Sequence, residues 1–172
     1  MSLLMDFLQR NATNKRVLAT LRCALVENTE MRAWPLLGSF GGIGAGQKAR
    51  AIRTVAGLFA VHTAHCEKGN MGTLCRKLCS HDEKPWENID PQGKAVPPGP
   101  MGRRFLYLIN ADKNEIFERV CRLVRYAKSR DVPVNYAALE KDLAEWPKAR
   151  EAWAGEFWAS AEKREEQEGE TA

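Results

Sequence analysis

The sequence GSFGGIGAGQKARA, residues 38–51, has the residue types of a phosphate-binding loop: clustered glycines, a lysine and the start of a predicted helix. Within it, the residues Gly44 to Ala49 match the G-x-G-x-x-[GA] template of dinucleotide-binding loops. That template also requires a strand before the loop, but the preceding segment contains Pro35 and no β-rich run. We therefore interpret the glycines as turn residues of a helix–helix connection rather than as a nucleotide loop.

The segment also does not match the P-loop pattern of nucleoside triphosphatases. Only one residue separates Gly46 from Lys48, and Ala49 stands where the metal-binding hydroxyl is required. The helix that follows places Lys48 near its start and Arg50 and Arg53 on the face opposite its apolar residues. Unpaired backbone N–H groups add positive partial charge at a helix start. These features predict a basic surface for the phosphates of a nucleic-acid backbone.

A second basic helix is predicted after Asp112, and its arginines wind along the side away from its apolar stripe. The basic residues of this region are Arg103, Arg104, Lys113, Arg119, Arg122 and Arg125. Glu115 precedes Arg119 by four residues, and Glu118 precedes Arg122 by four, so each arginine has a possible ion-pair partner on its own helix. Such pairs are worth only about 0.2–0.5 kcal/mol and would not prevent phosphate binding. An ordinary solvated helix face is the alternative interpretation.

The cysteines and histidines offer a weak case for zinc. The chain has five cysteines, which is an odd number, and its sequence shows no secretion signal. We therefore expect reduced thiols rather than disulfides. The candidate zinc ligands are His65, Cys66, Cys75 and Cys79, but their spacing is looser than in regular structural sites. We expect His62 to lie in the core of its helix instead. No serine elbow, H-E-x-x-H motif or close carboxylate pair is present, and capping explains Asp112, so we predict no enzyme, no cofactor and no small-molecule substrate.

The charge is distributed unevenly along the chain. Residues 1–130 carry 21 Lys and Arg against 11 Asp and Glu, a balance of +10, and residues 131–172 carry 5 against 11, a balance of −6. A basic body with an acidic tail suits a polyanionic partner, although an ordinary solvated surface would have the same composition. No apolar run approaches the ~20 residues needed to cross a bilayer, and we expect a cytoplasmic protein without a membrane partner.

Helices are expected to position the candidate side chains, because the apolar residues fall at helical spacing and the alternation typical of strands is absent. We predict an all-α fold of two small helical lobes joined by a long Pro- and Gly-containing loop. The N-terminal lobe spans residues 1–66 and includes the glycine loop; residues 67–102 form a flexible loop, with a helical turn or two near residues 73–78. The C-terminal lobe spans residues 103–172 and ends in an acidic tail. Asp112 or Asn114, and then Asn135, are predicted N-caps, and Pro147 is predicted in the first turn of the last helix.

Two segments carry a resemblance to a known family: GRRFLYLINADKNEIFERVCRLVRYAK at 102–128 and VPVNYAALEKDLAEWPKAREAWAGEFW at 132–158. They are similar to the CasB-type small subunit of the type I-E CRISPR surveillance complex Cascade. The N-terminal half agrees more loosely, through Leu18, Leu21, Arg22, Trp34 and the helix at 51–62. The resemblance spans about nine tenths of the chain, and the glycine and proline loops lie outside its specific part.

The resemblance implies an all-helical, non-catalytic protein that lies as two copies along the Cascade backbone and near its large subunit. It implies contact with CRISPR RNA, target DNA and the displaced strand, which favours the open R-loop. By position, the family's nucleic-acid contacts fall on Lys48, Arg50, Arg53, Asn110, Lys113, Arg122, Lys148 and Arg150. Asn110 departs from the family, in which a basic residue is often found. A purely structural protein-interaction module remains the alternative function.

Overall fold

The computed structural model describes residues 2–159, and within them the regular structure is helical, as predicted. The chain begins with α1 (Leu3–Arg10) and α2 (Lys15–Arg22), followed by the short 3-10 segments η1 (Cys23–Leu25) and η2 (Glu30–Ala33). The remaining elements are α3 (Trp34–Leu37), η3 (Gly38–Phe40), α4 (Gln47–Val61), α5 (Met71–Lys77), α6 (Pro100–Ile109), α7 (Glu115–Ser129), α8 (Tyr136–Ala144) and α9 (Arg150–Trp158). The predicted acidic end at 165–172 lies outside the described residues.

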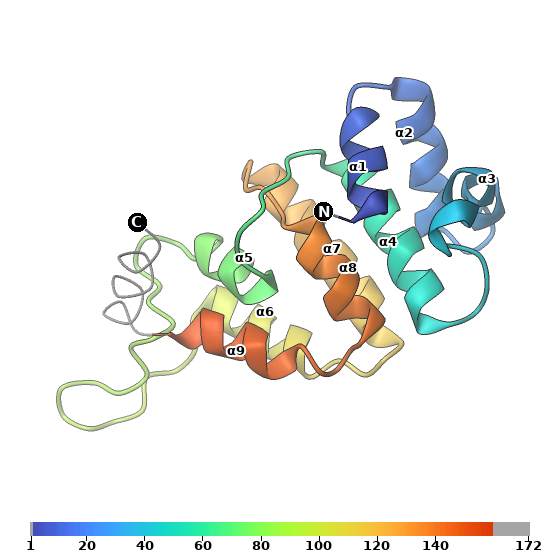
Figure 1. Cartoon of the computed structure of the whole chain (residues 1–172). Coiled ribbons are helices and arrows are strands. Elements are labelled where there is room, and N and C mark those ends of the chain that lie inside the picture. The colour runs from blue at the N-terminus through green and yellow to red at the C-terminus, as the bar shows by residue number, and fades with distance from the viewer. Residues whose placement is uncertain (1, 160–172) are drawn as a thin grey trace.

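Helix α4 lies between the N-terminal helices and the pair α7 and α8 (Figure 1). It packs against α1 and α2 on one side and against α7 and α8 on the other, and every residue from 51 to 60 is buried. A helix that is covered on several sides has no long solvent face. This arrangement explains why α4 carries small and apolar residues around its whole circumference, including Ala51, Val55, Ala56 and Ala60.

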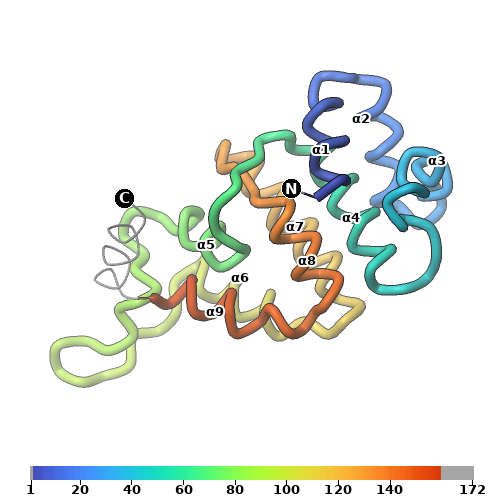
Figure 2. Tube along the Cα trace, viewed as in Figure 1, coloured from blue at the N-terminus to red at the C-terminus, as the bar shows by residue number. Residues whose placement is uncertain are grey.

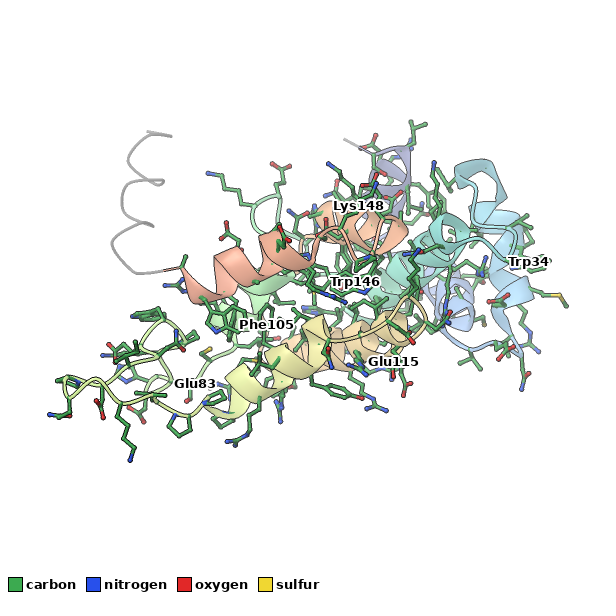
Figure 3. All side chains as sticks on the ribbon, turned by 90° about the horizontal axis from the view of Figure 1, so that it is seen from below. Trp34, Glu83, Phe105, Glu115, Trp146 and Lys148 are labelled. Atoms are coloured by element: carbon green, nitrogen blue, oxygen red, sulfur yellow. The ribbon has the colours of Figure 1, made fainter. Side chains whose placement is uncertain are left out.

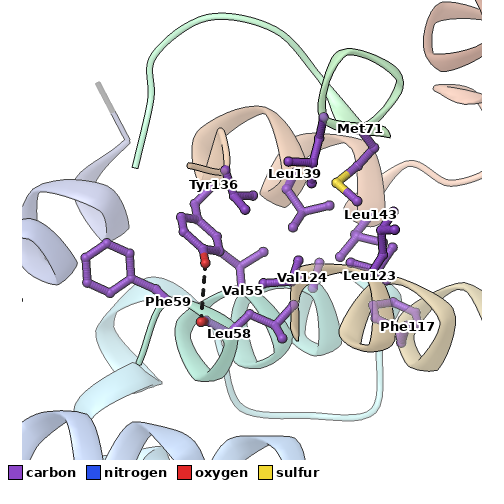
Figure 4. Packing of buried hydrophobic residues seen from close by; sticks show 14 of the residues in the cluster. Val55, Leu58, Phe59, Met71, Phe117, Leu123, Val124, Tyr136, Leu139 and Leu143 are labelled. Atoms are coloured by element: carbon purple, nitrogen blue, oxygen red, sulfur yellow. Dashed lines mark hydrogen bonds between the residues drawn. The ribbon is translucent and has the colours of Figure 1, made fainter. Parts of the chain in front are cut away.

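The contact between α4 and α8 brings together segments that are about 80 residues apart in sequence. Tyr136 is fully buried, and its hydroxyl donates to the backbone oxygens of His62 (2.5 Å) and Leu58 (3.3 Å). Around it, apolar side chains of α4, α7 and α8 fill one core (Figure 4). Burying each large aliphatic side chain contributes about 1.5–3 kcal/mol. These contacts join the N-terminal and the C-terminal predicted lobes in one core. The division of the chain into two lobes stays a prediction.

Helices α5, α6 and α9 pack together on the side of the molecule away from α2 and α3 (Figure 1). Phe105 of α6 stacks on Phe157 of α9, with ring centroids 4.1 Å apart, and Trp158 meets Phe105 edge-on at 5.3 Å. Trp153 and Phe157 are both buried, so the aromatic side chains at this spacing form the inward face of α9. The placement of Pro147 is wrong, because α9 begins three residues later, at Arg150.

The segment predicted as a flexible loop contains one helix and several backbone anchors. Asn70 caps α5 in a capping box with Thr73, which explains why this short helix forms where the apolar pattern is weak. Beyond α5 the chain makes an extended excursion before α6 (Figure 2). The Glu83 carboxylate then accepts from the backbone N–H groups of Met101 and Gly102 at the start of α6. Flexibility of this segment stays a prediction.

Candidate nucleic-acid interface

Three segments that are far apart in sequence meet at the start of α4. The side-chain amide of Gln47 donates to the backbone oxygens of Leu143 (2.9 Å) and Trp146 (3.0 Å), which ties α4 to the connection between α8 and α9. The Trp146 indole N–H and the Arg150 guanidinium both donate to the backbone oxygen of Ala111, at 3.1 and 3.2 Å. These bonds hold the α6–α7 turn against the same connection.

The joined segments present lysines from three parts of the chain, and we call Lys48, Lys113 and Lys148 the lysine edge. All three side chains are exposed. Figure 3 shows Lys148 next to Trp146, on the connection that joins α8 to α9. Its ammonium lies 3.8 Å from Glu145, an exposed pair that contributes little. Asn110, the departure from the family pattern, is also exposed and lies in the turn before Lys113.

Asp112 lies within this edge, and its carboxylate is used by the backbone. Its Oδ1 accepts from the N–H groups of Glu115 (2.8 Å) and Asn114 (2.7 Å), and its own N–H donates to the Glu115 carboxylate. The sequence-based interpretation of Asp112 as a cap is confirmed. The hydrogen bonds from Glu115 and Asn114 also hold the pKa of Asp112 below its usual value.

We expect Asp112→Ala to lower the thermal unfolding midpoint at pH 7, because α7 loses its cap. The pKa of Asp112 is lower in the folded than in the unfolded chain, so its stabilisation is present above about pH 4 and is lost as the pH falls through the folded-state value. The difference from the wild-type midpoint should therefore shrink at lower pH. Asn114→Ala is the control, since the Asn114 side chain makes no capping bond. An equal loss at pH 7 and pH 2 would contradict the assignment.

The arginines of α7 pair with their own helix, as the spacing predicted. Arg119 contacts Glu115 at 2.8 Å, and Arg122 contacts Glu118 at 2.5 Å. Arg122 remains largely exposed in its pair, whereas the Arg119 side chain is only 11% exposed. Phosphate contact is therefore open to Arg122 and largely closed to Arg119.

Two Arg–Tyr stacks join the antiparallel helices α6 and α7. The Arg104 guanidinium lies 4.6 Å from the ring centroid of Tyr126, and Arg119 lies 3.8 Å from that of Tyr107. Arg104 is still exposed in its stack. Arg103 is exposed as well and donates to the backbone oxygen of Pro98.

A groove of about 760 Å³ lies between α4, α7 and the segment that leads to α3. Arg50 lines it with its guanidinium 4.3 Å above the Phe117 ring, and Arg125 is exposed beside it. Its charged lining residues are Arg50, Arg53 and Arg125 together with Glu27, Glu30 and Glu118. The three arginines and three glutamates leave the lining of this groove with no net formal charge.

The placement of Arg53 on a basic surface is wrong. Its residue is 6% exposed, and one guanidinium nitrogen, Nη1, donates to the backbone oxygens of Gly42 and Gly44, both at 2.8 Å. Its Nε lies 3.2 Å from the Glu30 carboxylate. Arg53 therefore holds the glycine loop and η2 onto α4, and its guanidinium does not face solvent.

The candidate zinc ligands do not come together. No group of three or more His, Cys, Asp and Glu side chains within residues 2–159 could hold a metal ion. His65 and Cys66 run alongside Val134 in backbone pairing. Burial raises the pKa of the Cys75 thiol, and that of Cys79 to about 11, so both are protonated at neutral pH in the metal-free chain. His62 is buried, with Nε2 2.8 Å from the Val132 oxygen, which confirms its predicted core position.

Comparison with known proteins gives the family. The family model described as CRISPR-associated protein Cse2 matches residues 17–158. This chain belongs to the Cse2 family. Members of the Cse2 family are structural, CRISPR-associated subunits of Cascade complexes, so the resemblance seen in the sequence is confirmed.

Solved structures agree with this assignment at the level of the fold. CasB from Thermus thermophilus has a TM-score of 0.67 and 22% identity, covering 93% of this chain and 100% of its own. A second Thermus thermophilus structure, of a CRISPR-associated protein of the Cse2 family, has a TM-score of 0.66 and 24% identity, with the same coverage. A search of curated proteins finds no match. Within residues 2–159 of this Cse2-family chain, no helix has the length and apolar character to span a bilayer.

Several residues that hold the candidate surface together have no role predicted from the sequence. Gln47, Ala111 and Trp146 bring the lysine edge together, and Glu30 neutralises Arg53. No role is predicted for Tyr107, because it falls outside the apolar stripe of its helix. An aromatic residue at a position that does not face the core is nevertheless a sequence pattern that can indicate a binding surface. No local signal marks Gln47, whose partners lie almost 100 residues away.

Proposed function

We propose that this Cse2-family chain is a non-catalytic Cascade subunit that binds nucleic-acid backbones and stabilises the R-loop. The observation that carries the proposal is that hydrogen bonds join three separate segments at Gln47, Ala111 and Trp146, within two residues of the exposed Lys48, Lys113 and Lys148. Such an edge offers several cations to successive phosphates. R-loop formation is nearly balanced in free energy, so modest backbone contacts tip it toward the open state. CRISPR RNA, target DNA and a second copy of the chain are the partners that this function includes.

The proposal separates residues that bind directly from residues that hold the fold. Lysine ammonium groups act as point charges toward phosphate and need no fixed geometry. Arg122 and Arg125 extend the basic surface along α7, and both are exposed. Arg150 contributes positive charge beside the edge while its guanidinium donates to Ala111.

The test is the salt dependence of oligonucleotide binding by the full chain. We expect the triple variant Lys48→Gln, Lys113→Gln, Lys148→Gln to bind single-stranded DNA more weakly. The slope of log K against log salt should fall in magnitude by about 0.7 for each lost single-strand phosphate contact. Fluorescence anisotropy at several salt concentrations measures both quantities.

The matched control removes three exposed lysines from other parts of the chain. Lys15→Gln, Lys77→Gln and Lys94→Gln together change the net charge equally but lie outside the lysine edge. If the control variant loses as much affinity and as much salt dependence as the edge variant, the oligonucleotide is attracted by the net charge of the whole protein. The lysine edge is then not a specific binding site. Unchanged binding in the edge variant would overturn the proposal.

A purely structural interaction module is the second candidate, and the groove between α4 and α7 favours it. Glu27, Glu30 and Glu118 oppose its arginines, which suits a protein segment with mixed charges better than a polyanion. Reconstitution of Cascade with the edge variant decides between the functions. Lost assembly indicates a scaffold role, whereas normal assembly with poor target retention indicates the R-loop role.

A further inference from the structure

An exposed aromatic ring lies beside the lysine edge. Tyr107 is 53% exposed and Leu106 is 41% exposed, although both belong to a helix whose other apolar residues are mostly covered. They line an open hollow of about 470 Å³, together with Ile109, Asn110 and Arg150. Asn110 is three residues from Lys113 and Arg150 is two residues from Lys148, so the hollow lies close to these two lysines.

The Tyr107 ring is held in place from one side only. The Arg119 guanidinium lies 3.8 Å from its centroid, and Arg119 also donates to the Tyr107 backbone oxygen. Arg119 is fixed in turn by Glu115 at 2.8 Å. Arg119 covers one face of the ring, while the residue is 53% exposed and lines the open hollow. A ring that is already immobilised loses little entropy when a planar group stacks on it.

The charge around the hollow indicates what could occupy it. Arg150 lines it, Lys113 follows in the same turn, and Lys148 precedes Arg150 by two residues. The nearby carboxylates of Asp112 and Glu115 are engaged with the backbone and with Arg119. An occupant with an apolar planar part and negative charge fits this surface. Unpaired nucleotides have both, whereas a duplex hides the faces of its bases.

We propose that Tyr107 stacks an unpaired nucleobase of a single strand whose phosphates lie along the lysine edge. The inference rests on the proposed function and adds to it a mode of recognition, in which single-stranded nucleic acid is bound through a base face as well as through its charge. Asn110 then has a polar role at the rim of the hollow, where its amide can donate to a base or a phosphate.

The experiment compares a single-stranded oligonucleotide with an abasic strand of equal length, using the full chain and fluorescence anisotropy. The two strands carry the same phosphates but differ in bases. We expect the wild-type chain to bind the base-containing strand about 5- to 150-fold more tightly, the range for one stacked base. Tyr107→Ala should abolish most of that preference while leaving abasic binding unchanged, and Tyr107→Phe should retain it. Far-UV circular dichroism and thermal unfolding confirm that both variants fold.

The outcomes separate this inference from the function on which it rests. If the wild-type chain binds both strands equally, or Tyr107→Ala retains the preference, base stacking at Tyr107 is overturned while backbone binding stands. If the wild-type chain binds neither strand, the proposed function fails as well. If Tyr107→Ala prevents incorporation into reconstituted Cascade but leaves oligonucleotide binding unchanged, a neighbouring subunit covers the hollow and the inference is wrong.

Discussion

Replacing Gly72 by alanine should lower the free energy of unfolding by about 3 kcal/mol, at the upper end of the cost of overpacking. A Cβ at this position would lie 1.9 Å from the backbone oxygen of Trp153 and 2.8 Å from its carbonyl carbon. Because both atoms belong to the backbone, no side-chain rotation relieves the clash. Helix α5 would have to move away from α9, which we expect to appear as a lower urea midpoint.

The matched control for Gly72 lies on α9 itself. Gly155 has an open position, where an added Cβ would meet nothing within 4 Å, and it is exposed on its helix. Gly155→Ala should therefore stabilise the chain by about 0.5–1 kcal/mol through helix propensity. Equal unfolding free energies for the wild-type chain and Gly72→Ala would show that α5 does not rest on Trp153 as described.

The helices and their caps could be predicted because they depend on neighbouring residues. Asn135 accepts from the Ala138 N–H at 3.1 Å, and Asp112 caps α7, both as the residue types indicated. The Glu115–Arg119 pair follows from four-residue spacing alone. Each of these contacts spans at most four residues, so the sequence contains all the information that they need.

The position of Arg53 could not be predicted from helical spacing. Helical spacing predicts one apolar and one solvent-facing side for α4, whereas every residue from 51 to 60 is buried. The groups that cover Arg53 come from the glycine loop and from η2, at Gly42, Gly44 and Glu30. Only the tertiary fold shows that this loop returns over its own helix.

The lysine edge was predicted in part. The family resemblance pointed to Lys48, Lys113 and Lys148 individually, but nothing in the sequence placed them on neighbouring segments. Their arrangement depends on Gln47 and Trp146, whose hydrogen bonds cross 35 to 99 positions of the chain. Contacts of that range arise from packing, which local patterns do not encode.

Replacing Arg53 by alanine is the second change with a large expected effect, again a loss of about 3 kcal/mol of stability. Removing one partner of a buried ion pair typically costs about 3–5 kcal/mol. Glu30 keeps 26% of its side chain exposed and can be partly rehydrated, which favours the lower end. The backbone oxygens of Gly42 and Gly44 also lose their shared donor, so the glycine loop should loosen. Urea unfolding measures the loss.

The pair with Glu30 provides an internal control through a double-mutant cycle. Glu30→Ala alone leaves the buried guanidinium without its carboxylate, and the double variant should cost less than the sum of the two single changes. Arg53→Lys retains the charge but loses the fork of donors, so we expect an intermediate loss. Additive effects would show that the 3.2 Å contact contributes no coupling.

The Arg53→Ala variant also decides whether Arg53 binds nucleic acid or stabilises the fold. A charge reversal at Arg53 would disturb the glycine loop, so weakened binding by such a variant would report on structure rather than on phosphate contact. Lys48, on the same helix and exposed, tests the phosphate contact directly. If Arg53→Ala unfolds at the wild-type urea concentration yet binds oligonucleotides more weakly, the guanidinium is available to phosphate and its structural assignment is wrong. Lost stability together with normal binding at temperatures where the variant is folded establishes Arg53 as the residue that fastens the glycine loop to α4.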